Sequence, residues 1–285
     1  MSGSIRSFTE ALTHPMPHRP LRPLSVPEPA AAVYDRWLGE IEERLGDSTC
    51  DRVRLCRETL FALYYPGLRD YDGLVADPAT PLATRAALLA LDPRHITLEP
   101  EHYHEIDPER YARVKPLLWL WQSFDRTPLG GGNVTVGVRL RRILARHVFR
   151  RCGTNFKCFQ YVEFSFGYNM EVGDDVVIHR HVLLDDRETI RLGDRVSIAD
   201  YANVYTHSHD LVDPENVSST PVILGNGVRI TYHATLLEGI EVGEQGMVGA
   251  LAVATKRVRP YHVHLGIPAV PKLVKPNAPP DAGGP

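Results

Sequence analysis

The sequence has no hydrophobic run long enough to cross a lipid bilayer. Its longest strongly apolar stretch is Leu117–Trp121, whereas a membrane-spanning helix needs about 20 consecutive apolar residues. The N-terminus also lacks the charged and apolar blocks of a secretory signal. These absences argue against an integral membrane protein, and we expect a cytoplasmic one.

The chain also has little excess charge and few cysteines. Its 32 Lys and Arg residues against 35 Asp and Glu residues give a net charge of −3, so there is no electrostatic reason to expect a nucleic-acid partner. The spacing within the pairs Cys50/Cys56 and Cys152/Cys158 is wrong for the CxxC motifs of zinc and redox sites. We therefore expect four reduced thiols.

Composition divides the chain into four regions. Residues 1–29 carry six prolines between Pro15 and Pro29, which is typical of a flexible arm. Residues 30–150 show apolar side chains at helical spacing and predict a helical N-terminal region. Residues 151–275 follow a different period and predict a separate domain, and residues 276–285 predict a flexible tail.

Apolar residues recur every six positions in the second half of the chain. The first run is Phe166, Val172, Ile178 and Leu184, the second is Leu192, Ile198 and Val204, and the third is Leu224, Ile230, Leu236, Val242, Val248 and Ala254. This period fits neither an α-helix nor an amphipathic sheet. It fits a three-sided β-solenoid, in which each side takes six residues and stacking of the coils buries the apolar members.

The same region carries motifs that resemble those of hexapeptide-repeat acyltransferases, most closely the maltose/galactoside/nodulation-factor O-acetyltransferase branch. The motifs keep the order and spacing of that branch and are Phe166-Gly167-Tyr168-Asn169, Leu184-Asp185-Asp186, Val204-Tyr205-Thr206-His207-Ser208-His209, Pro221-Val222-Ile223-Leu224-Gly225-Asn226, Ala254-Thr255-Lys256 and Gly266-Ile267-Pro268-Ala269. The resemblance covers residues 160–275. Residues 1–150 lie outside it, and the sequence leaves their role open.

The resemblance implies a fold and an activity. The fold is a mainly β, left-handed parallel β-helix preceded here by an α-helical region, in a homotrimer with active sites between subunits. The activity is acyl-CoA-dependent O-acyl transfer, with acetyl-CoA as the cosubstrate and no metal required. The acceptor is a hydroxyl of a carbohydrate or glycosylated small molecule, although antibiotic-modifying acyltransferases share the architecture.

The resemblance places the catalytic histidine at His209. Acyl transfer from a thioester needs a base for the hydroxyl proton, and an imidazole serves this purpose at neutral pH. His207 is a substrate-binding candidate in the same segment. A partner should fix the tautomer of His209, and the sequence leaves Asp210, Asp213 and a backbone carbonyl as alternatives.

Two further residues are candidates for binding the acceptor. His179 aligns with an asparagine that is expected to help bind the acceptor or the oxyanion, and His181 replaces a second asparagine. These histidines leave open a different alcohol or an amine as acceptor. Asp186 aligns with the aspartate of the "LD" motif, although a turn residue at a corner of a coil would explain it equally well.

The donor is expected to lie along the last coils. Lys256 matches the lysine of the family's "VTK" motif and is a candidate for binding CoA. Lys272 and Lys275 follow the last coils and are candidates for its phosphates. Gly249 and Ala250 are small residues against which the pantetheine arm could lie.

Two other classes of function remain as alternatives. Histidines on adjacent coils bind zinc in γ-class carbonic anhydrases, and this chain has two His-x-His pairs, at residues 179–181 and 207–209. Their spacing does not reproduce the ligand pattern of that class. The second alternative is a non-catalytic trimeric solenoid that acts as a scaffold, which would not bind CoA.

Overall fold

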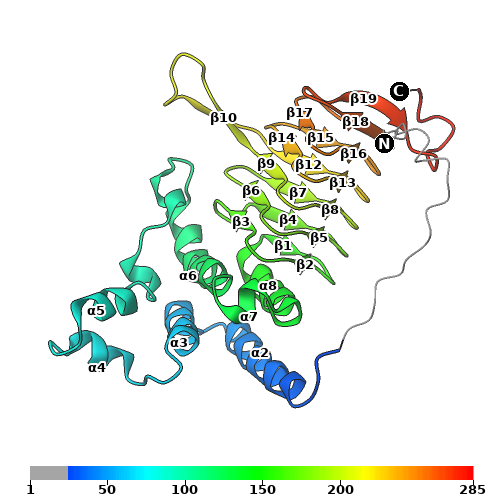
Figure 1. The fold of residues 1–285 in the computed structure, drawn as a ribbon. Coiled ribbons are helices and arrows are strands. Elements are labelled where there is room, and N and C mark those ends of the chain that lie inside the picture. The colour runs from blue at the N-terminus through cyan, green and yellow to red at the C-terminus, as the bar shows by residue number, and fades with distance from the viewer. Residues whose placement is uncertain (1–24, 285) are drawn as a thin grey trace, which may run out of the picture.

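The computed structural model describes residues 25–284, and the greater part of the proposed N-terminal arm, residues 1–24, lies outside this range together with Pro285. A helical region stands at one end of a parallel β-solenoid, and the coils rise from it toward the C-terminus (Figure 1). The predicted fold class, a mainly β solenoid after an α-helical region, is confirmed.

The helical region consists of four longer helices and of shorter helices between them. The helices are α2 (Ala30–Gly46), α3 (Arg52–Tyr64), α4 (Tyr71–Ala76), α5 (Leu82–Leu89), η1 (Pro93–His95), η2 (Glu99–His102), α6 (Pro108–Phe124), α7 (Pro128–Gly131) and α8 (Val134–Val148). Side chains cap several N-termini: Asp107 accepts the backbone N–H groups of Glu109 and Arg110 at the start of α6, which satisfies donors that the helix leaves unpaired. None of the helices between residues 25 and 284 is both long and apolar enough to span a bilayer.

The solenoid has three parallel sheets, one on each side of the prism. The first contains β1 (Arg151–Cys152), β4 (Met170–Val172), β7 (Ile190–Leu192), β12 (Val222–Leu224) and β15 (Glu241–Val242). The second contains β2 (Lys157–Cys158), β5 (Val177–Ile178), β8 (Ser197–Ile198), β13 (Arg229–Ile230), β16 (Met247–Val248) and β18 (His262–Leu265), and the antiparallel β19 (Val270–Val274) closes it. The third contains β3 (Glu163–Phe164), β6 (Leu183–Asp185), β9 (Asn203–Tyr205), β14 (Thr235–Leu236) and β17 (Val253–Ala254).

The six-residue period forms the core of the prism. All of the apolar residues in the three runs are at most 2% exposed. They also stack in register, since Ile178 pairs with Ile198 and Ile198 lies opposite Ile230 in the second sheet. The four cysteines are free thiols, as expected.

One hairpin interrupts the coils. β10 (His207–His209) and β11 (Val217–Ser219) pair antiparallel and leave the prism after β9 (Figure 1). The hydroxyls of Ser208 and Ser218, one on each strand, donate to the carboxylate of Glu238 at 2.5 and 3.0 Å. Because Glu238 follows β14 on the next coil, these bonds fix the hairpin to the wall of the solenoid.

A buried ion pair joins the helical region to the first coils. The Nε of Arg141 on α8 donates to the carboxylate of Asp125 at 2.9 Å, and the backbone N–H of Tyr161 donates to the same carboxylate at 2.6 Å. Arg141 also donates to the carbonyl oxygens of Gly130 and Cys158, at 2.8 and 3.3 Å. The junction therefore sets where α6 lies over the third sheet.

The described part of the C-terminal tail lies beside the last coil. We expected residues 276–285 to form a flexible tail, and within residues 276–284 the carbonyl oxygen of Gly284 accepts a hydrogen bond from Arg259 at 2.8 Å. The same carbonyl lies 3.1 Å from a ring nitrogen of His262 on β18.

Candidate active site

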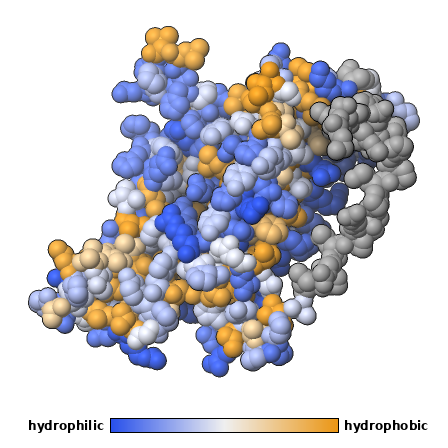
Figure 2. Space-filling model, in the orientation of Figure 1, coloured by the Kyte–Doolittle hydropathy of each residue, from blue (hydrophilic) through white to orange (hydrophobic). Residues whose placement is uncertain are grey.

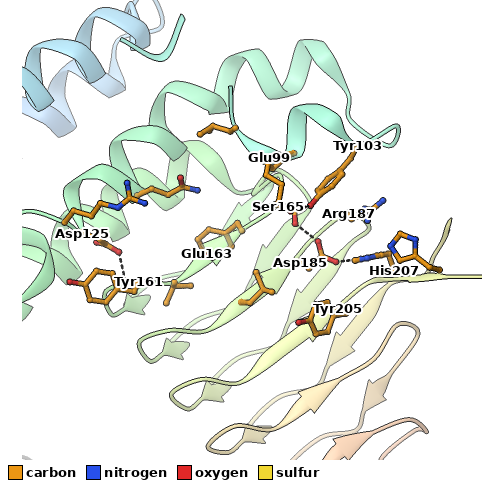
Figure 3. Close-up of a pocket in the computed structure, with 18 residues that line it drawn as sticks. Glu99, Tyr103, Asp125, Tyr161, Glu163, Ser165, Asp185, Arg187, Tyr205 and His207 are labelled. Atoms are coloured by element: carbon orange, nitrogen blue, oxygen red, sulfur yellow. Dashed lines mark hydrogen bonds and ion pairs between the residues drawn. The ribbon is translucent and has the colours of Figure 1, made fainter. Parts of the chain in front are cut away.

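A polar cavity of about 660 Å³ lies between the solenoid and the helical region. Its floor is the outer face of β3, β6 and β9, and its roof is η2 together with the C-terminal turn of α6 and the residues that follow it. Figure 3 shows the polar side chains of both surfaces turned toward this space. Both histidines of the hairpin line the cavity, as do acidic, basic and tyrosine side chains.

Asp185 holds the floor of the cavity together. Its carboxylate accepts the hydroxyl of Ser165 and is paired with Nδ1 of His207 (Figure 3). Its backbone carbonyl accepts the hydroxyl of Thr206 at 2.7 Å. Asp185 was not among the predicted site residues, and the only signal for it was its place beside Asp186 in the same motif.

His209 has a different partner. Its Nδ1 lies 2.6 Å from the carbonyl oxygen of Pro214, in the loop between the two strands of the hairpin. Because a carbonyl only accepts, Nδ1 carries the proton in the neutral ring, and Nε2 is left as the basic nitrogen. Of the partners left open by the sequence, the structure therefore favours a backbone carbonyl. The ring of His209 stands edge-on to that of His207, with 5.2 Å between centroids.

The roof is fixed to the floor by Arg187. This side chain is buried and donates to the carboxylate of Glu105 at 2.6 Å, while its guanidinium lies 4.2 Å from the ring centroid of Tyr103. The hydroxyl of Tyr103 donates to Glu99 at 2.6 Å, and burial together with that carboxylate raises the pKa of Tyr103. The segment that carries η2 is thus held over the site by Arg187 of the floor.

The structure does not bring Asp186 into the cavity. Its side chain is 0% exposed, and its carboxylate accepts the backbone N–H groups of Phe166 and Asn169 at 2.8 and 3.2 Å. Burial raises its pKa to about 7. Asp186 therefore holds the turn before β4. This agrees with the alternative considered from the sequence, that it is a turn residue at a corner of a coil.

His179 and His181 are also not among the residues that line the cavity. The ring of His179 stacks on Phe159 with 5.1 Å between centroids. His181 lies in a column of stacked rings between Tyr161 and Tyr201, at 4.9 and 4.8 Å. Both histidines are therefore engaged in packing between neighbouring coils.

The predicted CoA-binding residues lie on the later coils. Lys256 occupies on the coil of β17 the position that Thr206 occupies on the coil of β9, and the two strands lie in register two strands apart in the third sheet. The separation of Lys256 and Thr206 along the wall is therefore about 10 Å. Lys275 is half-buried, and burial together with the charge of Arg229 lowers its pKa. Lys272 is exposed on β19.

The two small residues differ in their surroundings. A Cβ on Gly249 would lie 1.9 Å from Cδ2 of Leu265, so a larger residue there would require the side chain of Leu265 to move. Ala250 is exposed in the turn that follows. Packing against Leu265 is thus one reason for a small residue at Gly249, and Ala250 remains free to contact a ligand.

No group that could hold a metal ion is present in the described chain. Across residues 25–284, no three His, Cys, Asp or Glu side chains converge in a suitable arrangement. The zinc alternative therefore has no donor set in this part of the molecule.

Comparisons with known proteins bear on the predicted resemblance. No protein-family model matches the chain. The galactoside O-acetyltransferase of Escherichia coli is 28% identical over 135 residues, which cover 46% of this chain and 66% of that protein. A probable acetyltransferase of Mycobacterium tuberculosis is 26% identical over 38% of this chain and 37% of that protein. The resemblance to hexapeptide-repeat acetyltransferases is confirmed. The matches nevertheless span less than two thirds of these relatives.

Solved structures show the same fold. The maltose O-acetyltransferase of Clostridium difficile aligns with a TM-score of 0.51 at 24% identity and covers 59% of this chain and 87% of its own. A hexapeptide-repeat acetyltransferase of Vibrio cholerae, solved with acetyl-CoA, aligns with a TM-score of 0.52 at 22% identity, over 64% of this chain and 98% of its own. Both structures therefore share the fold of the greater part of this chain.

Proposed function

We propose that this protein is an acetyl-CoA-dependent O-acetyltransferase that acts on a hydroxyl of a carbohydrate or glycosylated small molecule. The observation that carries the proposal is the distance of 2.6 Å between Nδ1 of His209 and the carbonyl oxygen of Pro214, beside a polar cavity. The likeness to galactoside and maltose O-acetyltransferases supports the reaction class and the acceptor class.

In the proposed reaction, Nε2 of His209 takes the proton of the acceptor hydroxyl as its oxygen attacks the thioester carbon. A C–O bond forms, the C–S bond breaks, and the proton passes to the departing thiolate of CoA. His207, oriented through Nδ1 by Asp185, presents its own Nε2 to the acceptor and positions it. The rigid solenoid contributes placement of the two substrates.

The later coils would bind the donor. Lys256 lies about 10 Å along the wall from the base of the hairpin. An acetyl-CoA molecule that extends along the wall from the hairpin would therefore contact Lys256. Lys275, beside Arg229, and the exposed Lys272 supply positive charge for phosphates. Ala250 and the narrow surface at Gly249 would face the pantetheine arm.

We further propose that the protein assembles as a homotrimer. At the tip of the hairpin, Leu211 and Val212 are 102% and 93% exposed, and Figure 2 shows a hydrophobic tip that projects from a hydrophilic stem. Such a tip is explained if it packs on a neighbouring chain. Light scattering on the native protein should give the mass of three chains, and Leu211→Asp with Val212→Asp should lower it. A native monomer would contradict this proposal.

The activity is tested by incubating mixtures of candidate acceptors with acetyl-CoA and the native protein, followed by mass spectrometry. We expect products that have gained one acetyl group and a matching release of CoA. If the protein neither binds acetyl-CoA nor acetylates any acceptor, this result would instead support the alternative of a non-catalytic scaffold.

A further inference from the structure

The polar side chains at the two ends of the cavity differ in how far they are already paired. At the end formed by Ser165, Asp185 and the hairpin histidines, the side chains bond to one another. The opposite end, here called the outer end, is lined by Gln122, Arg126, Tyr161 and Glu163. Among residues 25–284, these four side chains have no hydrogen-bond or ion-pair partner, and those of Arg126, Tyr161 and Glu163 are exposed.

The outer end lies beside the reacting end on the same floor. Glu163 on β3 is two residues before Ser165, so their Cα atoms are about 7 Å apart and their side chains point to the same face. Figure 3 shows Tyr161 and Glu163 on the side of the cavity away from His207. An acceptor whose hydroxyl reaches the histidines would therefore need a further unit to reach the outer end.

The backbone of the outer end and the ring of Tyr161 are held in place before any ligand binds. The ring of Tyr161 stacks on His181 at 4.9 Å, and its backbone N–H is bonded to Asp125 at 2.6 Å. Gln122 and Arg126 flank Asp125, which is fixed by the buried Arg141. The backbone therefore needs little rearrangement when a ligand binds, whereas the exposed side chains of Arg126 and Glu163 become ordered on binding.

The chemistry of the outer end selects for a neutral polyhydroxylated group. Arg126 only donates hydrogen bonds, Glu163 only accepts them when ionised, and Gln122 and Tyr161 do both. The opposite charges of Arg126 and Glu163 give the outer end no net preference for a charged ligand of either sign. Ring hydroxyls both donate and accept, and they match this set.

We propose that the outer end binds a second glycosyl unit, so that the enzyme acetylates disaccharides and longer glycosides in preference to monosaccharide glycosides. This inference rests on the proposed function, because it assigns the acceptor of the same site. It also gives the helical region a role, since Gln122 and Arg126 lie at the end of α6 and just after it.

The test compares matched acceptors with saturating acetyl-CoA: lactose with methyl β-galactoside, and maltose with methyl α-glucoside. In the pair that is acetylated faster, we expect kcat/KM to be at least about tenfold higher for the disaccharide than for the methyl glycoside. This difference should arise from a lower KM for the disaccharide. Glu163→Gln and Gln122→Ala should each reduce that advantage by about fivefold and change the methyl glycoside by less than about twofold. Glu244→Gln is the matched control, since this exposed glutamate lies in the turn between β15 and β16, and it should change neither acceptor.

The outcomes separate this inference from the proposed function. Acetylation of both acceptors without a preference would contradict binding of a second glycosyl unit, and so would variants that slow both reactions equally. Either result would leave the proposed acetyltransferase activity standing. If neither acceptor is acetylated, binding of both is measured by saturation-transfer NMR in the presence of CoA. A dissociation constant that is not lower for the disaccharide than for the methyl glycoside would then contradict the second glycosyl unit. Absence of both transfer and binding would overturn the carbohydrate acceptor itself.

Discussion

At the scale of single residues, the adjacent aspartates Asp185 and Asp186 have different tasks. Asp185 faces the cavity and orients His207, whereas Asp186 turns inward and holds the backbone of Phe166 and Asn169. Neighbouring residues of a strand point to opposite faces, and the motif itself does not say which carboxylate faces out. The sequence therefore pointed to a segment that lines the cavity, but the geometry was needed to separate its two carboxylates.

The buried position of Asp186 predicts a pH dependence of stability. Its folded-state pKa of about 7 lies above the value of about 3.9 for an exposed aspartate, so the folded protein holds this proton more tightly than the unfolded chain. The contribution to stability is fully present below about pH 4 and is lost as the pH rises through about 7, by at most about 4 kcal/mol.

Asp186→Asn isolates this contribution, because asparagine does not titrate in this range. We expect the free energy of unfolding of the native protein, minus that of the variant, to fall between pH 4 and pH 7 in urea titrations. A difference that rises over this interval would mean that Asp186 is ionised in the folded protein.

At the scale of elements, the periodic parts of the molecule were predictable and the roof of the site was not. A six-residue step is visible in the sequence because every coil repeats it, and the hairpin is visible as an interruption. The roof depends on Arg187 reaching Glu105 and Tyr103. These residues lie far apart in the chain and belong to no repeat, so no pattern links them.

The roof predicts a specific effect on the acceptor. Arg187→Met removes the bonds to Glu105 and the contact with Tyr103, so the segment around η2 loses its fixed position. We expect the KM of the acceptor to rise about tenfold, which corresponds to about 1.4 kcal/mol, while the KM of acetyl-CoA stays within about twofold. Steady-state kinetics with each substrate varied in turn measures both.

Arg191→Met is the matched control for this variant. Arg191 on β7 pairs with Glu171 at 2.8 Å in the first sheet, outside the residues that line the cavity. This control should leave both constants unchanged. Equal effects of the two substitutions on the acceptor would contradict the role of Arg187.

At the scale of the whole molecule, a rigid solenoid supplies the floor and a separate helical region supplies the roof. The buried pair of Arg141 and Asp125 joins them, and both side chains are at most 3% exposed. Removing one partner of a buried ion pair leaves an uncompensated charge. The junction is therefore the point at which the two parts depend on each other.

Arg141→Met should lower the free energy of unfolding by about 3–5 kcal/mol, measured by calorimetry or urea titration. Adding Asp125→Leu should recover part of the loss, because no buried charge is then left unpaired. Arg139→Met, which breaks an exposed pair with Asp35, should cost at most about 1 kcal/mol. Equal losses from Arg141→Met and Arg139→Met would contradict a structural junction at Arg141.

The central claim is that one imidazole, held by a backbone carbonyl at the edge of a cavity, removes the proton of the acceptor. Its most direct test is the kcat for acetyl transfer of His209→Ala beside the native protein and His95→Ala, an exposed histidine of the helical region. We predict that His209→Ala lowers kcat by about 10²–10⁴ with an unchanged dissociation constant for acetyl-CoA, and that His95→Ala matches the native protein. A kcat for His209→Ala within about threefold of native would contradict the account.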